Sequence, residues 1–156
     1  MRDGGASMKS IKAILGDRQM FTVERRCSVA EAARLMSARQ IGAVPVVEDG
    51  RLVGIFSERD VLTRVVAAGR SAETTTVGDV MSTDLIVAEA NEDYEVCLAR
   101  MQQYHVRHLL ILEQGALAGI ASLRDVLAAD LDEKSEAITL LNAYVHYIPV
   151  DLQKTR

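Results

Sequence analysis

The sequence predicts a mixed α/β fold in which a strand–helix–strand–strand–helix unit occurs twice and is followed by one further helix. The first observation is a heptapeptide at residues 54–60, GIFSERD, that recurs 65 residues later at residues 119–125 as GIASLRD. The second is that residues 24–62 align with residues 89–127 at the same offset without a gap, with 12 identical pairs in 39 positions. Self-similarity at one fixed offset indicates two copies of one supersecondary unit.

The length of the chain limits how the repeats are organised. Each repeat, with about 60 residues, would bury only a marginal core by itself, so the two halves are expected to pack as a pseudo-twofold pair. We expect five segments, in this order: a flexible leader (residues 1–8), the first repeat (9–68), a polar linker (69–76), the second repeat (77–131) and a C-terminal helix (132–149).

Composition excludes several classes of function. The net charge of −4 gives no general attraction to nucleic acid or to anionic membranes. Trp is absent and aromatic residues make up 4% of the chain, which disfavours base-stacking platforms. No apolar run reaches about 18 residues and no signal peptide is recognisable, so a cytoplasmic protein is expected. Cys27 and Cys97 form no disulfide framework and are expected to be reduced thiols.

The first repeat shows a clear order of elements. A short helix is expected at residues 10–16 and a strand at 21–23. Ser28 and Glu31 have the spacing of a capping box, and the helix after them carries an apolar face. Strands at 41–47 and 52–56 flank a two-residue hairpin turn. Ser57 is expected to begin a helix that runs to about Ala67. The apolar face comprises Val29, Ala32, Ala33 and Met36, and the turn is Asp49–Gly50.

The second repeat follows the same plan. It opens at residues 77–81 and continues with a strand at 85–88. Asn91 is the expected cap of the next helix, whose apolar face places Cys97 in the core. The second hairpin pairs residues 108–112 with 117–121, and Ser122 begins the closing helix. The apolar face comprises Tyr94, Cys97, Leu98 and Met101, and the hairpin turn is Gln114–Gly115.

An apolar stripe lies beyond the second repeat. It comprises Ile138, Leu141, Val145 and Ile148, and Pro149 is expected to end its helix. Two interpretations remain open, because the stripe could dock on its own chain or form a dimer contact.

The heptapeptides also allow two interpretations. Ser57 with Asp60, and Ser122 with Asp125, have the spacing of helix caps. The same arrangement can form a ligand site, because free N–H groups at a helix start attract phosphate. An Asp one turn into the helix can accept both hydroxyls of a ribose, and a nearby Arg can pair with phosphate oxygens.

Both repeats resemble a tandem pair of CBS domains, a Bateman module, and the chain is similar to small stand-alone bacterial two-CBS proteins. The resemblance covers about residues 8–130. It rests on two strand segments, residues 41–46 (IGAVPV) and 106–111 (VRHLLI), each followed by a heptapeptide. The family binds adenosine-containing ligands such as AMP, ADP, ATP, NAD or S-adenosylmethionine in clefts between paired repeats, and commonly forms dimers.

The resemblance implies two ligand sites, one for each repeat. In each, the Asp would hold the ribose and the Ser would lie near the ribose and phosphate. The first site would comprise Ile41, Gly42, Ala43, Pro45, Ser57, Arg59 and Asp60. The second would comprise Val106, Arg107, His108, Ser122, Arg124 and Asp125.

The second repeat departs from the first at three strand positions. Arg107, His108 and Leu110 stand where the first repeat has Gly42, Ala43 and Pro45. The second site is therefore expected to be bulkier and more cationic, and the first to be roomier.

Other chemistry is weakly represented. His105 and His108 have no accompanying carboxylate or Cys ligand pattern, so no metal is expected. Neither a phosphate-binding P-loop nor an activated nucleophile is recognisable. The expected function is a non-catalytic regulatory module that binds an adenine nucleotide, forms a homodimer and acts on an unidentified effector protein in trans. The alternatives are a structural or interaction dimer with empty clefts, and a small enzyme.

Overall fold

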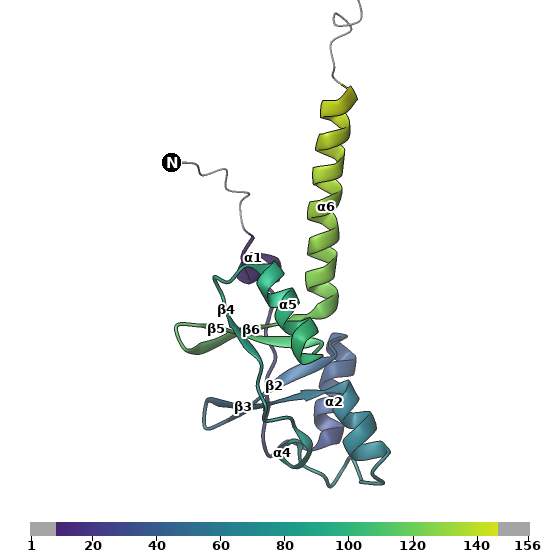
Figure 1. The fold of residues 1–156 in the computed structure, drawn as a ribbon. Helices are drawn as coiled ribbons and strands as arrows, with labels where there is room; N and C mark the ends of the chain where they lie inside the picture. Colours follow the sequence, from purple (N-terminus) through teal and green to yellow (C-terminus); the bar gives the residue numbers. More distant parts are fainter. Residues whose placement is uncertain (1–8, 147–156) are drawn as a thin grey trace, which may run out of the picture.

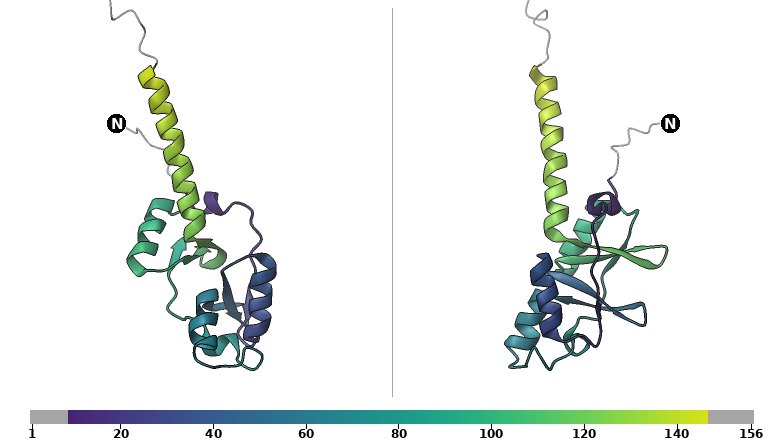
Figure 2. Two further views of the ribbon diagram at one scale, coloured as in Figure 1. Left: turned by 90° about the vertical axis from the view of Figure 1, so that its right-hand side faces the viewer. Right: turned by 180° about the vertical axis from the view of Figure 1, so that it is seen from behind.

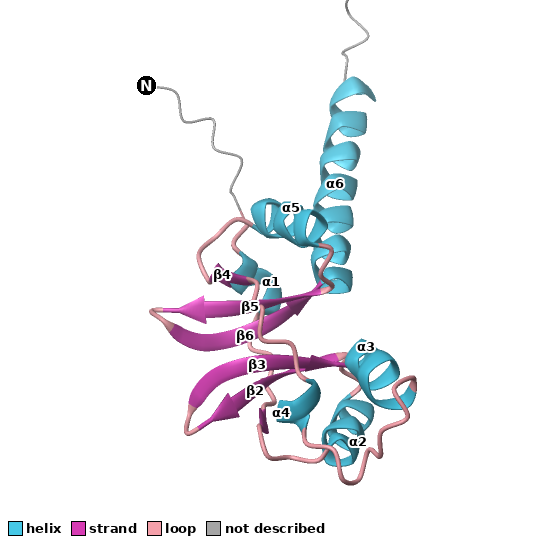
Figure 3. Cartoon of the chain, turned by 60° about the horizontal axis from the view of Figure 1, so that its bottom comes forward, coloured by secondary structure: helices cyan, strands magenta, loops and turns pink. Residues whose placement is uncertain are grey.

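The computed structural model of the chain describes residues 9–146, with side chains as far as residue 143. Within that range the strands form two three-stranded sheets, ordered β1-β2-β3 and β4-β5-β6. The first sheet comprises β1 (Val23–Glu24), β2 (Ala43–Glu48) and β3 (Arg51–Ser57), and the second comprises β4 (Val87–Glu89), β5 (His108–Glu113) and β6 (Ala116–Ser122). The two hairpins lie side by side, with helices outside them (Figure 3). The predicted mixed α/β fold with a duplicated unit is confirmed.

The two hairpins are equivalent in detail. In each sheet the first strand runs parallel to the second, and the second pairs antiparallel with the third. The register shifts at Val46/Val47 in one hairpin and at Ile111/Leu112 in the other, which are positions 65 residues apart. Both turns have two residues of positive φ, Asp49–Gly50 and Gln114–Gly115, as the tight hairpin turn requires.

The short helices that open the repeats are exchanged between the two cores. Helix α1 (Ile11–Leu15) precedes the first sheet in sequence, but Ile11 and Leu15 are buried in the core of the second repeat with Tyr94. Helix α4 (Val77–Val80) precedes the second sheet and packs in the first core. The predicted division places these segments with the repeat that follows each of them, whereas each completes the core of the other repeat.

Two glycines permit this exchange. A Cβ on Gly54 would lie 2.5 Å from Met81 Sδ and 3.0 Å from the Ser82 carbonyl oxygen. A Cβ on Gly119, 65 residues later, would lie 2.9 Å from Leu15 Cδ1. The exchanged segment therefore lies against the bare backbone of the third strand in each repeat. Ile55 and Ser82 add a pair of backbone hydrogen bonds, of 3.0 and 2.9 Å, at this contact.

Helix α2 (Val29–Arg39) begins with the predicted capping box, since Ser28 and Glu31 cap one another. The predicted cap of α5 (Tyr94–Tyr104) is wrong. Asp93 is the N-cap, and its carboxylate accepts a hydrogen bond of 2.7 Å from the Glu95 backbone N–H. Asn91 lies too far ahead of the helix, whereas Asp93 is the residue that the 65-residue offset equates with Ser28.

Two further helices differ from the prediction. The helix after Ser57 consists of one turn, α3 (Glu58–Asp60), which continues as a π-helix over Val61–Val66. The separate helix expected after Asp132 is wrong, because a single helix, α6 (Leu123–His146), runs on from the second heptapeptide without a break. Good helix formers (Leu, Ala, Glu and Lys) occupy six of the nine positions at residues 126–134, and no Gly or Pro interrupts them.

Helix α6 extends well beyond the rest of the chain (Figures 1 and 2). Its base is anchored by Asp130, which accepts a hydrogen bond of 3.0 Å from the Tyr94 hydroxyl and pairs with Lys134 at 2.7 Å. Ile138 and Leu141 are exposed, so this part of the predicted stripe does not dock on its own chain. The side chain of Val145, together with Ile148, Pro149 and the leader, lies outside the described part. None of the described helices is apolar enough over a sufficient length to cross a membrane.

Candidate ligand clefts

Two clefts lie between the repeats, and each takes its walls from both. The first, of about 1350 Å³, combines the start of β2 with the start of α6. The second, of about 460 Å³, combines the start of β5 with the start of α3. The second volume lies within the range of about 300–1,000 Å³ that is typical of small-molecule sites, and the first exceeds it.

The predicted site residues are therefore grouped differently from the expectation. The first cleft brings Ile41, Gly42 and Ala43 together with Arg107, His108, Ser122, Arg124 and Asp125. The second brings Ser57, Arg59 and Asp60 together with Val106, Arg107 and His108. Pro45 lines neither cleft and is buried in β2 opposite Ile55. Five of the six residues expected for the second site, all but Val106, thus line the first cleft together, whereas the residues expected for the first site are divided between the two clefts. The division arises because the start of each second strand faces the helix of the other repeat.

The linings do not show the expected contrast between a roomy and a cationic cleft. Gly42 and Arg124 line the same cleft, and Arg107 and His108 line both. The two clefts differ in size, but each has arginines at its rim.

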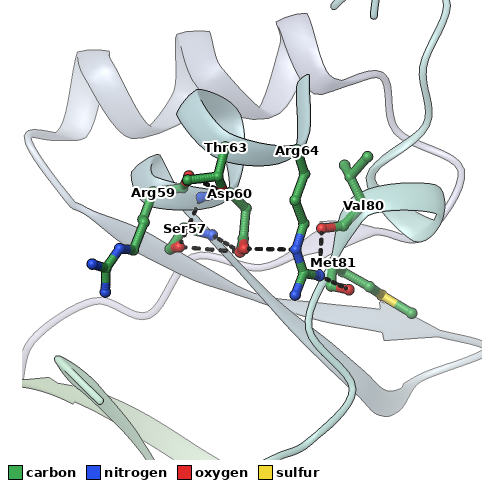
Figure 4. A network of polar contacts seen from close by, with 7 residues as sticks. All are labelled: Ser57, Arg59, Asp60, Thr63, Arg64, Val80 and Met81. Carbon is green, nitrogen blue, oxygen red and sulfur yellow. Dashed lines mark hydrogen bonds and ion pairs between the residues drawn. The ribbon is translucent and has the colours of Figure 1, made fainter. Parts of the chain in front are cut away.

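Ser57 and Asp60 form the polar end of the second cleft (Figure 4). The Ser57 backbone N–H donates to Asp60 Oδ2 at 2.9 Å and its hydroxyl does so at 3.0 Å, while the Asp60 N–H donates back to Ser57 Oγ at 3.3 Å. Arg64 lies 3.6 Å from Asp60 Oδ1 and also donates to the carbonyls of Val80 and Met81 at 3.1 and 2.9 Å. Asp60 is 8% exposed, and its carboxylate thus has a definite structural role, as the helix-cap interpretation predicts.

Ser122 and Asp125 repeat half of this arrangement in the first cleft. The Asp125 N–H donates to Ser122 Oγ at 3.1 Å, and the carboxylate pairs with Arg18 at 2.7 Å. Burial acts to raise the pKa of Asp125, but hydrogen bonds from Ser122 and Arg18 outweigh it, and the pKa lies below its ordinary value. Asp125 is therefore an anion at neutral pH. Because its cation partner comes from the mostly exposed N-terminal segment, a ligand hydroxyl can compete for it.

Three arginines at the cleft rims make no side-chain hydrogen bond or ion pair within residues 9–143. Arg59 lines only the second cleft, Arg124 only the first, and Arg107 both. In Figure 4 the Arg59 side chain points away from the Ser57–Asp60 network. These guanidinium groups are available to pair with an anionic group of a ligand.

His108 lies where the two repeats meet. A Cβ on Gly42 would lie 3.2 Å from Glu58 Oε1 and 3.4 Å from His108 Nε2, so both side chains occupy the space that Gly42 leaves open. Burial lowers the pKa of His108 and outweighs the opposing influence of Glu58 and Asp125, so the imidazole is neutral at pH 7. Within the described residues no group of three or more metal-binding side chains includes it.

Sequence reasoning missed the segments that lead into each first strand. Residues 18–21 line the first cleft, and residues 81–84 with Ile86 line the second. The offset of 65 residues relates these segments too, although they share no identical residue. The available signal was the pair of apolar residues just before each strand, Met20–Phe21 and Leu85–Ile86.

The CBS domain model matches this chain twice, at residues 11–67 and 77–132. The chain belongs to the CBS domain family. It is 36% identical over 135 residues to the CBS domain-containing protein YhcV of Bacillus subtilis, covering 86% of this chain and 95% of that protein. The predicted resemblance is confirmed, and the repeats are a pair of CBS domains.

Solved CBS pairs share the fold. A putative signal-transduction protein with CBS domains from Burkholderia ambifaria superposes with a TM-score of 0.75 at 30% identity, over 79% of this chain and 94% of that chain. The CBS domain pair of protein MJ0100 superposes with a TM-score of 0.73 at 22% identity, over 81% of this chain and 98% of that chain. It was solved with 5′-methylthioadenosine and S-adenosyl-L-methionine.

The cysteines take no part in either cleft of this CBS pair. Cys97 is buried in the core, as predicted, and both thiols are free. Burial is the main factor that raises the pKa of each thiol to about 11, so neither is a reactive thiolate at neutral pH.

Proposed function

We propose that this CBS pair is a non-catalytic regulatory module that binds an adenosine-containing ligand in its two inter-repeat clefts. The observation that carries the proposal is the composition of each cleft. Each joins a Ser–Asp pair, able to hold a ribose, to apolar side chains and to arginines that make no side-chain pairing within residues 9–143. Those three features match the ribose, the base and the phosphate of a nucleotide.

In the second cleft the adenine would lie between apolar side chains, and the ribose would reach Asp60. The apolar side chains are Ile55, Met81, Ile86, Val106 and Leu110. A carboxylate has about four acceptor sites, so Asp60 can cap its helix and still accept ribose hydroxyls. Arg59 and Arg107 would face the phosphate.

In the first cleft the ribose would reach Asp125 by displacing Arg18. The base would lie against apolar residues from both repeats, which include Met20, Ile41 and Ile120. Arg107 and Arg124 would face the phosphate. Because this cleft is the larger, it has room for the longer ligands, such as ATP or NAD.

Binding of two adenosine derivatives by the MJ0100 pair supports an adenosine-type ligand for this fold. It favours no particular nucleotide for this chain. Among AMP, ADP, ATP, NAD and S-adenosylmethionine, the unpaired arginines favour the ligands that carry phosphate.

Calorimetric titration with AMP, ATP, NAD and S-adenosylmethionine tests the proposal. Charge-assisted hydrogen bonds are worth about 1.5–3 kcal/mol each, so Asp60→Asn and Asp125→Asn should each weaken one cleft at least about tenfold. Asp132→Asn removes the same charge from an exposed position of α6 that lines neither cleft, and should bind as the unaltered protein does.

The competing function is a structural dimer in which the Ser–Asp pairs only cap helices. The complete capping box at Ser57 and Asp60 favours this alternative. It predicts that none of the four ligands binds, and that Asp60→Asn changes the stability of the fold alone.

We further propose that the bound nucleotide is not turned over. Among the described residues no group of three or more His, Cys, Asp or Glu side chains is placed to hold the Mg²⁺ that phosphoryl transfer uses, and both cysteine thiols are protonated. Incubation with ATP should release no phosphate above background. Steady release that is abolished by Asp60→Asn would show instead that the protein is an enzyme.

We propose that helix α6 connects ligand binding in the first cleft to the contact with a partner. Leu127 and Leu131 line the first cleft, and Ile138 and Leu141 continue the same side of the helix into solvent. Their spacings of 4, 7 and 3 residues follow the 3.5-residue period of a coiled-coil seam. A second copy packed along α6 would cover these side chains, and the resulting homodimer would act on an effector in trans.

A further inference from the structure

The two clefts have three lining residues in common. Glu58, Arg107 and His108 line both, and we call these three residues the shared wall. Every other lining side chain belongs to one cleft only.

The shared wall is built asymmetrically. At the 65-residue offset, Gly42 corresponds to Arg107, Ala43 to His108, and Glu58 to Leu123. The second repeat therefore contributes a guanidinium and an imidazole where the first contributes neither. The absence of a side chain at Gly42 leaves the space in which Glu58 approaches His108.

The charges of the shared wall nearly cancel. Arg107 is the one permanent cation in it, and Glu58 is an anion. His108 faces Glu58, Asp125 and Arg107, and it is neutral at pH 7 because burial lowers its pKa. The wall thus has one guanidinium to offer to two clefts, and a carboxylate that repels a phosphate in either.

We propose that Arg107 serves both clefts, so that a phosphate bound in one weakens the binding of a second phosphate in the other. This inference rests on the proposed function and adds a negative coupling to it. Once Arg107 pairs with the phosphate in one cleft, it is no longer available to a phosphate in the other cleft. That second phosphate is also repelled by the Glu58 carboxylate and by the first phosphate on the other side of the shared wall. Couplings between binding sites are typically about 5- to 150-fold, and the second AMP should bind at least fivefold more weakly than its cleft alone would allow.

Adenosine and AMP are the matched probes, because they differ only in the phosphate. Calorimetric titration gives the product of the two stepwise affinities of the unaltered protein. The single-cleft affinities come from Asp125→Asn, which weakens the first cleft, and Asp60→Asn, which weakens the second. For AMP, the product should fall at least fivefold below the product of the two single-cleft affinities, and for adenosine the two products should agree.

Arginine variants assign the coupling to the shared wall. Arg107→Met should weaken AMP in both clefts and leave adenosine unchanged. Arg59→Met should weaken AMP in the second cleft only, and Arg124→Met in the first only. Arg107→Lys keeps the charge and should retain the coupling. The unfolding midpoints of all four variants should match that of the unaltered protein and so show that each is folded, since Arg59, Arg107 and Arg124 make no side-chain pairing within the described part of the chain.

The outcomes separate the two proposals. Two AMP molecules that bind with no coupling would overturn the shared role of Arg107 and leave the ligand function intact. Equal coupling for adenosine and AMP would also overturn it, because the phosphate would not be the cause. No binding of either probe would overturn the proposed function, and the coupling with it.

Discussion

Asp60 and Ser57 cap one another at the start of α3, through three hydrogen bonds of 2.9, 3.0 and 3.3 Å. The same aspartate is the residue proposed to hold a ribose. Its structural and binding roles therefore have to be separated before any loss of affinity is attributed to ligand contacts.

Asp60→Ala should lower the free energy of unfolding by about 1–2 kcal/mol, because the capping box loses two hydrogen bonds at a buried site. Asp125→Ala should cost less, since the Asp125 side chain is more exposed than that of Asp60, at 27% against 11%, and it pairs with the exposed Arg18. Urea denaturation of both variants measures the difference. Equal losses would show that Asp60 has no special structural role.

Gly54→Ala should destabilise the fold by about 1–3 kcal/mol, the usual cost of overpacking. The new Cβ would meet Met81 Sδ at 2.5 Å and the Ser82 carbonyl oxygen at 3.0 Å, and a backbone atom has little freedom to move. Gly119→Ala is the matched comparison and should cost less, since it meets only the mobile end of Leu15, at 2.9 Å. A Gly119→Ala variant that is the less stable of the two in urea would contradict this.

Acidification should weaken the contacts that the Asp130 carboxylate makes with Lys134 and Tyr94, and so lower the stability of the fold. Pairing with Lys134 is the main cause that lowers the pKa of Asp130, and the Tyr94 hydroxyl adds to it. A carboxyl whose pKa is lower in the folded than in the unfolded chain binds fewer protons when folded. Its contribution to stability is therefore complete above the unfolded value of about 3.9 and is lost as the pH falls toward the folded value.

The measurement is the urea midpoint between pH 3 and 6 for the unaltered protein and for Asp130→Asn. The variant should lose less stability on acidification, because it has no proton to gain at residue 130. Asp132→Asn is the control, because Asp132 lies two residues after Asp130 in α6 and is exposed. The same acid loss in Asp130→Asn as in the unaltered protein would rule out this role for Asp130.

Ile138→Glu should weaken the proposed dimer at least tenfold. Ile138 is 57% exposed and lies in the middle of the side of α6 that carries Leu131 and Leu141, so a charge there would have to be buried in the seam. Thr139→Glu puts the same charge on the neighbouring, exposed position and should leave the dimer intact. Sedimentation velocity over a concentration series decides, and a monomeric mass for the unaltered protein at micromolar concentration would end the dimer proposal.

The local elements followed from the sequence because short-range chemistry determines them. The capping box at Ser28, the turns at Gly50 and Gly115 and the duplicated heptapeptides all depend on residues within a few positions of one another. The offset of 65 residues then predicted the same elements in the second repeat. It would also have identified Asp93 as the cap of α5 instead of Asn91, had it been applied there.

The pairing of elements across the repeats required the tertiary structure. The sequence of α1 does not show whether the helix packs in the first core or the second, since Ile11 and Leu15 would fill an apolar gap in either. The close approach of Leu15 to Gly119 places the helix in the second core. For the same reason the candidate site residues were named from the sequence, but those of the first repeat were grouped in one cleft although they line two. Which strand start faces which helix depends on how the two repeats dock, and that follows from long-range packing rather than from the order of residues along the chain.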